Sequence, residues 1–242
     1  MTPPPPPRVV VLAAPSGGGK TTIARELRTR APETFGYSVS ATTRKARPGE
    51  RDGEAYHFLT RPEFERRREA GEFLEATEYA GELYGTLRSE VEQVLRSGKH
   101  VVLDVEVTGA RQVRKAYPRP ASVVLFVIPP SPRVLIERLR KRRTESEAEL
   151  SRRIGIATHE VETARREIGD VYDRVLVNDD LETAVREVIA VVQGGGAGGG
   201  EGDGGRDAAQ RAPADMTSLL SDFVRQLRSE AAQLKQSTGR SR

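Results

Sequence analysis

Short apolar runs alternate along the chain with longer segments whose apolar residues recur at helical spacing. Val9–Ala14 is a β-branched run bounded by proline and glycine, and Thr21–Arg30 after it has the period of a helix. Three further runs have the same apolar character: His100–Val107, Ala121–Ile128 and Asp173–Asn178. Runs of this kind are typical of strands that are buried on both faces. Their alternation with helices predicts an α/β protein with a mostly parallel sheet.

The region between the first helix and the run that begins at His100 has a different pattern. Its strands are alternating or mixed, in Tyr37–Thr43, Ala55–Leu59 and Phe73–Thr86, and a charged helix is expected over Pro62–Ala70. Short strands with a charged helix among them indicate a separate α+β part. The pattern therefore predicts an insertion in the sheet domain, at about residues 37–97.

The composition changes abruptly after Gln193. Residues 194–214 begin with GGGAGGGEGDGG, which has no large apolar side chain and predicts a flexible linker. Residues 215–236 then predict an amphipathic helix, whose apolar face consists of Leu219, Leu220, Phe223, Val224, Leu227, Ala231 and Leu234. An isolated helix of this length is marginal in water. Three alternatives stay open: the helix folds back or self-associates, it docks another protein, or it lies on a membrane surface.

The leader and the overall composition narrow the class of protein. Residues 1–8 are rich in proline and lack the layout of a signal peptide, so a short disordered leader is expected. The chain has 242 residues, of which 36% are hydrophobic and 31% charged, and no apolar run approaches the ~20 residues that span a membrane. Because there is no cysteine, disulfides, thiolate metal sites and thiol nucleophiles are excluded. We expect a cytoplasmic protein with no membrane partner.

The charge of the chain favours an acidic partner without identifying it. The formal net charge is +4, and residues 133–153 hold eight Lys or Arg against four Glu. Nucleotide phosphate, nucleic acid or no specific partner would all be compatible with this charge. The basic tail lacks the interleaved aromatic side chains on which nucleic-acid bases stack. Nucleic acid is therefore not expected as a partner.

The stretch Ala14–Thr22, APSGGGKTT, lies where the first strand ends and the first helix begins. A nucleoside triphosphate requires converging main-chain N–H groups, glycines that leave the approach open, and a helix N-terminus. Lys20 would then reach the β and γ phosphates, and the Thr21 hydroxyl would bind Mg²⁺. The expected ATP-binding residues of the stretch are Ala14, Pro15, Ser16, Gly17, Gly18, Gly19, Lys20, Thr21 and Thr22. The stretch departs from the pattern GxxxxGK[ST] at Ala14, where the pattern has glycine.

A second candidate site lies in the expected insertion. Its sequence SVSATTRKARPGERDGEAYHF holds Arg44 and Arg47, three positions apart, and phenols follow at Tyr56 and Tyr84. Two guanidinium groups with phenols nearby would suit a small phosphate dianion. A solvated basic turn is the alternative, and these residues alone do not decide between the two.

Residues from Val9 to Val192, about three quarters of the chain, resemble guanylate kinases. The matching motifs occur in the family's order: APSGGGKT, SVSATTRKARPGExxGxxYHF, FLExxxYxxxxYGT, VLDVExxGA, VIPPS, RLxxR with TES, and VNDD. The resemblance implies a three-layer P-loop kinase fold over about residues 9–193, with a mostly parallel central sheet, an inserted GMP-binding α+β region and an arginine-rich helical lid at about 138–155. It also implies ATP-dependent phosphorylation of GMP, and of dGMP, with Mg²⁺ as cofactor, in purine nucleotide metabolism.

The resemblance further implies which residues bind GMP. In the family, arginines and tyrosines that match Arg44, Arg47, Tyr56 and Tyr84 hold the phosphate, and residues that match Glu75, Ser40 and Thr86 read the guanine. A carboxylate can accept two hydrogen bonds, from guanine N1–H and the 2-amino group, whereas adenine has no such pair of donors. Asp104 and Glu106 match two acids near the acceptor ribose, the base or a Mg²⁺-bound water. Many members have aspartate in place of Glu106.

The resemblance gives the arginine-rich segment a role as well. Arg138, Arg142 and Arg153 match lid arginines that contact ATP and the transferred phosphoryl group, and with Lys20 and Arg44 they form the expected catalytic set. Arg143 stands where the family usually has glycine, and we expect Arg140, Lys141 and Arg143 to form a solvated helix face. Asn178 matches a segment near the adenine, where a cap of the loop is the alternative.

Two other functions share part of this pattern. A related P-loop kinase that acts on a phosphorylated sugar would have the same phosphate loop and lid. A non-catalytic guanylate kinase-like module would bind protein ligands in the former GMP cleft, but such modules have lost the phosphate loop, and Lys20 and Thr21 are present here.

Overall fold

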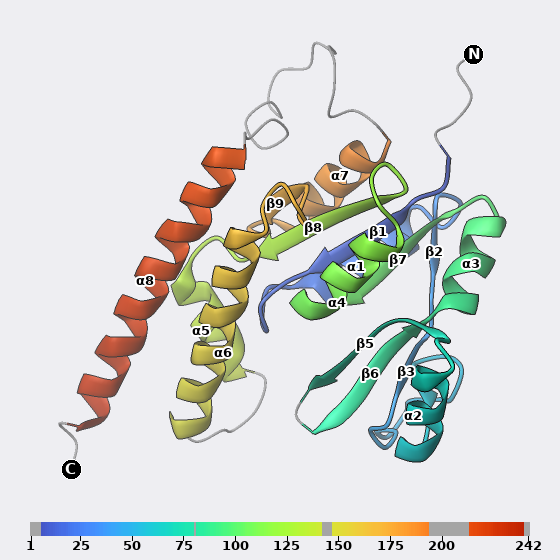
Figure 1. The fold of residues 1–242 in the computed structure, drawn as a ribbon. Helices are drawn as coiled ribbons and strands as arrows, with labels where there is room; N and C mark the ends of the chain where they lie inside the picture. Colours follow the sequence, from blue (N-terminus) through green and yellow to red (C-terminus); the bar gives the residue numbers. More distant parts are fainter. Residues whose placement is uncertain (1–5, 80, 142–146, 194–212, 240–242) are drawn as a thin grey trace, which may run out of the picture. The chain divides into compact units, whose positions relative to one another are not determined.

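The computed structural model describes residues 6–79, 81–141, 147–193 and 213–239 (Figure 1). Strands and helices alternate along most of these residues. In chain order they are β1 Val9–Ala13, α1 Lys20–Arg30, β2 Phe35–Tyr37, β3 Ser40–Thr42, β4 His57–Phe58, α2 Arg61–Glu69, β5 Phe73–Tyr79, β6 Glu82–Leu87, α3 Arg88–Arg96, β7 His100–Val105, α4 Val107–Ala116, β8 Ser122–Ile128, α5 Pro132–Lys141, α6 Glu147–Arg166, β9 Arg174–Val177, α7 Leu181–Val192 and α8 Pro213–Gly239.

The strands form two sheets. The five-stranded sheet has the order β2-β7-β1-β8-β9, and the four-stranded sheet has the order β4-β3-β6-β5. The pairs β2–β7 and β8–β9 are parallel, whereas β5–β6 and β3–β6 are antiparallel. The four apolar runs of the sequence all became strands of the five-stranded sheet. The expected α/β class with a mostly parallel central sheet is confirmed.

The chain divides into two compact units. Unit 1 consists of Met1–Leu12 and Ala24–Val123, and unit 2 of Ala13–Ile23 and Val124–Arg242. The predicted GMP-binding residues belong to unit 1, and the phosphate loop and lid belong to unit 2.

Unit 1 has an apolar cluster under its four-stranded sheet. Ala41, Phe64, Phe73, Leu83 and Leu87 are all buried there, and the rings of Phe64 and Phe73 stack at 4.3 Å between centroids. Phe64 is supplied by α2, which begins where the Thr60 hydroxyl accepts a hydrogen bond from the main-chain N–H three residues later. This packing fixes the face of the sheet from which the predicted base-reading residues project.

The expected strand Tyr37–Thr43 is wrong as a single element. Phe35–Tyr37 forms β2, which pairs with β7 in the five-stranded sheet, and Ser40–Thr42 forms β3, which pairs with β6 in the four-stranded sheet. The intervening Ser38 is 2% exposed. The run is uniformly strand-like in composition, so only the pairing with distant strands reveals that the chain changes sheets here.

Unit 2 includes the C-terminal helix, whose apolar face is buried. Side chains of α8 that are at most 6% exposed are Met216, Leu220, Phe223, Val224 and Leu227, and α8 packs against α5 and α6. The Val175 main-chain N–H also donates to the Met216 sulfur at 3.2 Å, and Arg228 forms an ion pair with Glu162 of α6. The helix therefore folds back onto its own chain, which was part of the first of the three alternatives. Self-association, the other part of that alternative, stays a prediction.

The expected boundaries at both ends fall partly outside the described residues. Of the predicted linker only Pro213 and Ala214 are described, and they open α8, which runs to Gly239 rather than ending at residue 236. Of the predicted leader only residues 6–8 are described. No helix among the residues with described structure is long and apolar enough to cross a membrane.

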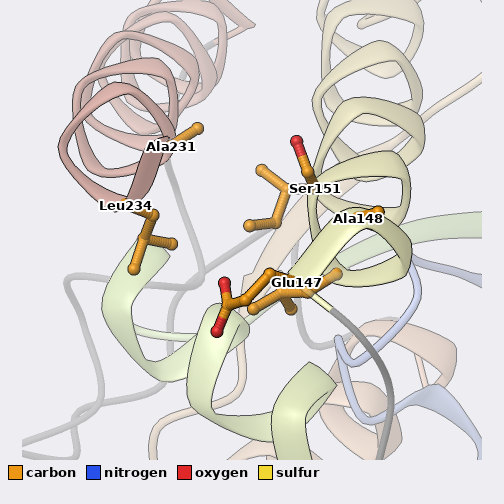
Figure 2. Close-up of a pocket in the computed structure, with 7 residues that line it drawn as sticks. Glu147, Ala148, Ser151, Ala231 and Leu234 are labelled. Carbon is orange, nitrogen blue, oxygen red and sulfur yellow. The ribbon is translucent and has the colours of Figure 1, made fainter. Parts of the chain in front are cut away.

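A groove remains between the last described turns of α8 and the start of α6. Its volume is about 250 Å³, and its lining is Glu147, Ala148, Leu150, Ser151, Ile154, Ala231 and Leu234. Figure 2 shows Ala231 and Leu234 of α8 on one side and Ala148 and Ser151 of α6 on the other. The two helices are thus packed less closely here than around the fully buried Leu220 and Leu227.

Truncation of the buried face of α8 is expected to destabilise the protein. Leu220 and Leu227 are both 0% exposed, so Leu220→Ala or Leu227→Ala should lower the free energy of unfolding by about 2–4 kcal/mol through lost burial and a residual cavity. Urea unfolding followed by circular dichroism measures this loss. Gln226→Ala, an exposed site on the same helix, is the matched control and should change it by less than about 0.5 kcal/mol. Wild-type midpoints for both leucine variants would show that α8 does not pack as described.

The buried His100 is expected to make stability depend on pH. Its Nδ1 accepts a hydrogen bond from the Arg8 main-chain N–H at 2.9 Å, and burial, with the nearby Arg8 charge, lowers its pKa below 6.5. The unfolded chain therefore binds a proton more readily, and stability should fall as the pH drops below about 6.5. Glutamine accepts the same bond without titrating, so the free energy of unfolding of His100→Gln should fall less than that of wild type between about pH 7 and pH 5.5. Parallel pH profiles of the two proteins would contradict this assignment.

Candidate active site

The phosphate loop of unit 2 is a tight turn between β1 and α1. The Gly18 N–H donates to the Pro15 carbonyl at 2.8 Å, and the N–H groups of Thr22 and Ile23 donate to the Gly19 carbonyl at 3.1 and 3.2 Å. Gly17 and Gly19 have φ of +89° and +100°, which side-chain-bearing residues rarely adopt. The glycines therefore set the conformation of the loop and carry no side chain that could cover its main chain.

Gly18 is enclosed on several sides. A Cβ atom at this position would lie 2.7 Å from the Ala14 Cβ and 2.9 Å from the Val127 carbonyl oxygen. Ala14, where the general pattern has glycine, is fully buried at the end of β1. Its methyl group occupies the space beside Gly18, so the departure from the pattern is accommodated in the packing beneath the loop.

Asn178 and Arg138 reach the same loop from β9 and α5. The Asn178 side chain is 6% exposed and its Nδ2 donates to the Gly18 carbonyl at 3.1 Å, while its main-chain N–H donates to the Ile128 carbonyl at 2.7 Å. The Arg138 guanidinium lies 3.5 Å from the main-chain carbonyl oxygen of Gly18 and 3.4 Å from the main-chain carbonyl oxygen of Asn178. The side chain of Asn178 is thus a cap of the loop, which was the alternative to adenine recognition; its contact with ATP stays a prediction.

The first residues of α1 complete this half of the site. Lys20 is half-buried and Thr21 is exposed at the helix N-terminus, where partial positive charge favours anions. The neighbouring Ser16 N–H donates to a carboxylate oxygen of Glu160 at 3.3 Å. Sequence reasoning gave no role to Glu160, which lies on α6 more than a hundred residues away.

The lid segment is described in part. Arg138 lies near the end of α5, and Arg153 is half-buried on α6. Arg142 and Arg143 lie outside the described residues, as does the TES motif. Arg140 and Lys141 are exposed, which agrees with a solvated helix face.

In unit 1 the three predicted base-reading residues lie on one line across the four-stranded sheet. Ser40 of β3 pairs with Thr86 of β6, which pairs with Glu75 of β5. The Thr86 hydroxyl donates to Glu75 Oε1 at 2.7 Å, and the two residues are 1% and 5% exposed. A register shift in β5 between Phe73 and Glu75 brings Glu75 opposite Thr86. The structure therefore brings together residues that are up to 46 positions apart in the sequence, from Ser40 to Thr86.

The predicted phosphate-binding residues form a second group in unit 1. The Arg44 guanidinium forms a bidentate pair with Glu50 at 2.9 and 3.0 Å and lies 5.4 Å from the Tyr56 ring centroid. The Tyr56 and Tyr84 rings are 6.1 Å apart between centroids. Glu50 also accepts the Arg47 main-chain N–H at 2.7 Å, and Arg47 itself is exposed. Arg44, Tyr56 and Tyr84 are thus neighbours, as the resemblance implied.

Glu50 anchors Arg44 and was missed by sequence reasoning. Its hydrogen bonds from Arg44 and then from the Arg47 main chain lower its pKa to about 2, so the carboxylate remains ionised at any pH near neutral. The same pairing raises the pKa of Arg44. Glu50 is the last residue of the sequence RKARPGE. An acidic residue six positions after Arg44 was the only signal in this stretch that could have indicated the ion pair.

Asp104, at the end of β7, is close enough to two phenols to affect them. Burial raises the pKa of both Tyr37 and Tyr56, and the charge of Asp104 raises both further. Tyr37, whose ring stacks under the Arg28 guanidinium at 3.8 Å, was not predicted as part of the site. Glu106 is the N-cap residue of α4, and its side chain forms no capping hydrogen bond.

Comparisons with known proteins identify the family of this chain. The family model described as guanylate kinase matches residues 6–194. The chain is 46% identical to the guanylate kinase of Trichormus variabilis over 70% of this chain and 81% of that protein, and 48% identical to that of Symbiobacterium thermophilum over 72% and 78%. The crystal structure of guanylate kinase from Anaplasma phagocytophilum matches with a TM-score of 0.57 and 31% identity, over 78% of this chain and 86% of that one. The chain therefore belongs to the guanylate kinase family.

Proposed function

We propose that this protein transfers the γ-phosphoryl group of ATP to GMP, which yields ADP and GDP. The observation that carries the proposal is the buried carboxylate of Glu75, which accepts the Thr86 hydroxyl at 2.7 Å in line with Ser40. Relatives of this chain at 46% and 48% identity are named guanylate kinase, and that name supports the same acceptor.

Glu75 explains how GMP would be told from AMP. Guanine presents N1–H and the 2-amino group side by side, and a carboxylate can accept from both. Adenine presents no such pair, so binding it would leave a 5%-exposed carboxylate with the Thr86 hydroxyl but without the two base donors that would offset more of its desolvation. A site built to hydrogen-bond a group rejects analogues that lack it.

We assign the GMP phosphate to Arg44, Arg47, Tyr56 and Tyr84. The pair with Glu50 holds Arg44 in one orientation, so its guanidinium is already positioned before a ligand arrives. The raised pKa of Tyr56 keeps that phenol protonated and able to donate to an anion. Asp104 and Glu106 are assigned to the acceptor side, at the end of β7 and the start of α4.

We assign the ATP phosphates to the main-chain amides of the loop and to Lys20, with Arg138, Arg142 and Arg153 on the transferred group. A GMP phosphate oxygen forms the new bond to the γ phosphorus as the bond to the β-phosphate oxygen breaks, and ADP leaves. No general base is required, because a phosphate monoester has a second pKa of about 6 and is already anionic near neutral pH. The residues therefore act by alignment and by stabilising charge on oxygen.

The residues at the start of α1 fit Mg²⁺ as the metal that accompanies ATP. Thr21 offers an exposed hydroxyl oxygen beside the loop, and Mg²⁺ commonly takes few protein ligands, with phosphate oxygens and water completing its shell. The described residues include no group of three or more His, Cys, Asp or Glu that could hold a metal, so a cage made only of protein ligands is not part of the proposal. When bound, Mg²⁺ supplies charge neutralisation at the β and γ phosphates.

Two further assignments belong to the proposal. We place the activity in about residues 9–193, with the GMP-binding insertion at about 37–97 and the lid at about 138–155. We also place the protein in the cytoplasm, since a chain without cysteine suits a reducing compartment.

Removal of the loop lysine is expected to abolish turnover with GMP. Lys20→Met keeps the length of the side chain but removes its charge at the β and γ phosphates, so kcat should fall by at least about 100-fold. A coupled assay of ADP release, with GMP, AMP and a phosphorylated pentose as acceptors, measures this. Lys115→Met, at an exposed site on α4, is the matched control and should retain wild-type turnover. Activity on AMP or the sugar phosphate without activity on GMP, or an active Lys20→Met, would refute the proposed function.

A side chain at Gly18 is expected to disrupt ATP binding. The Cβ of Gly18→Ala would lie 2.9 Å from the Val127 carbonyl oxygen and 2.7 Å from the Ala14 methyl group, so the loop must shift. Overpacking of this size costs about 1–3 kcal/mol, and the dissociation constant for ATP, measured by calorimetry, should rise by about tenfold or more. Ala232→Ser, which adds one heavy atom at an exposed position of α8 outside the lid, should bind ATP as wild type does. Equal affinities in Gly18→Ala and wild type would show that the loop amides do not hold the phosphates.

A further inference from the structure

Strand β5, which carries Glu75, is held by helix α4 of the same unit. The Ala76 main-chain N–H donates to Gln112 Oε1 at 3.1 Å, and Gln112 Nε2 donates to the Ala76 carbonyl at 3.1 Å. One carboxamide thus binds both main-chain groups of the residue that follows Glu75. Gln112 was not among the residues predicted to form the site.

The position of β5 in its sheet explains why this pairing matters. β5 is an edge strand, because the order of the sheet is β4-β3-β6-β5 and, among the strands that the structure describes, β6 alone pairs with it. An edge strand has main-chain groups on its outer side that no neighbouring strand satisfies. The carboxamide of Gln112 places an N–H donor beside its carbonyl acceptor, which is the arrangement that such a residue requires. It therefore fixes the main chain next to Glu75 where the sheet alone would leave it unrestrained.

One turn earlier on α4, Gly109 leaves room for the carboxylate of Glu75. A Cβ built at this buried glycine would lie 2.6 Å from Glu75 Oε2 and 3.2 Å from its Cδ. Residues three apart lie on the same face of a helix, so Gly109 and Gln112 both face β5. The carboxylate thus lies against bare main chain of α4, while the Thr86 hydroxyl binds its other oxygen at 2.7 Å.

We propose that Gly109 and Gln112 are positioning residues that set the specificity of this protein for guanine by fixing where the Glu75 carboxylate lies. The inference rests on the proposed function, in which Glu75 accepts the two guanine donors. Gly109 sets how closely the carboxylate approaches α4, and Gln112 sets the main chain from which the side chain projects. Neither residue touches the nucleotide in this account.

Displacement of the Glu75 carboxylate should change the preference for GMP over IMP, whereas general destabilisation of the protein should not. IMP retains N1–H but lacks the 2-amino group of GMP, so only GMP benefits from a carboxylate that reaches both donors. When the carboxylate is displaced, that second hydrogen bond weakens and GMP should lose more than IMP. The ratio of kcat/KM for GMP to kcat/KM for IMP therefore reports the position of Glu75.

The test compares Gly109→Ala and Gln112→Met with wild type in full-length protein. Methionine has about the length of glutamine but cannot form the two bonds to Ala76. We expect Gly109→Ala to raise the KM for GMP about tenfold and to lower the GMP/IMP ratio of kcat/KM about tenfold. For Gln112→Met we expect each change to be about fivefold. Changes of this size correspond to the loss of one to two net hydrogen bonds. The KM for ATP should stay within about twofold of wild type, because the phosphate loop is unchanged.

Matched control variants test whether a similar substitution far from Glu75 also changes the GMP/IMP ratio. Ala232→Ser on α8 adds one heavy atom at an exposed helical position outside the lid, and Gln93→Met removes an exposed carboxamide from α3. Both should retain the wild-type GMP/IMP ratio. Thermal unfolding confirms that each variant is folded at the assay temperature, and if Gly109→Ala is not, Gln112→Met decides the question.

The outcomes separate this inference from the function on which it rests. A wild-type protein that does not phosphorylate GMP refutes the proposed function. A wild-type protein that does, with variants whose GMP/IMP ratio equals that of the controls, refutes only the positioning role. Equal increases in the KM for ATP and for GMP in both variants, at an unchanged ratio, would also refute it, because they indicate a general structural defect.

Discussion

The conformation of the glycine loop that joins β1 to α1 is the constraint on which the rest of unit 2 depends. Amides can bind phosphate only if no side chain covers them and if the loop does not collapse, and these two requirements conflict. In this structure the loop is held in shape by the groups on which it packs. Ala14, the Val127 carbonyl and the Asn178 side chain surround Gly18 and Gly19. These groups lie at the carboxyl ends of β1, β8 and β9, the edge at which open α/β sheets bind ligands.

In unit 1 the corresponding constraint is that the charged side chains of Arg44 and Glu75 must be held in place before a ligand neutralises them. Arg44 has Glu50, and Glu75 has the Thr86 hydroxyl, so each of these two charges has a partner within 3.0 Å. Such partners offset part of the cost of burial and reduce the number of orientations a side chain can adopt. These two side chains are therefore ordered by contacts within their own unit, and ligand binding need not supply the free energy to order them.

Much of this arrangement could be predicted because it is local in sequence. Apolar runs identified β1, β7, β8 and β9, and contiguous motifs identified Arg44, Thr86 and the phosphate loop. What could not be predicted depends on pairing between distant segments. The division of Tyr37–Thr43 between two sheets, the register shift before Glu75, and the approach of Gln112 to Ala76 all follow from which strands and helices meet. A local pattern gives the type of element but not its partner.

Helix α8 shows the same limit at the scale of a whole helix. Its apolar stripe predicted a helix, but a stripe specifies only that some apolar surface must cover it. The family match ends at residue 194, so no motif of the family could name the partner. In the structure the partners are α5 and α6, the helices that carry Arg138 and Arg153. Because α6 packs against α8 and also carries Arg153, which we assign to the lid, the burial of Leu220 and Leu227 and the orientation of α6 are not independent in this chain. A segment outside the family's common domain thereby shares a hydrophobic core with the helices assigned to phosphoryl transfer.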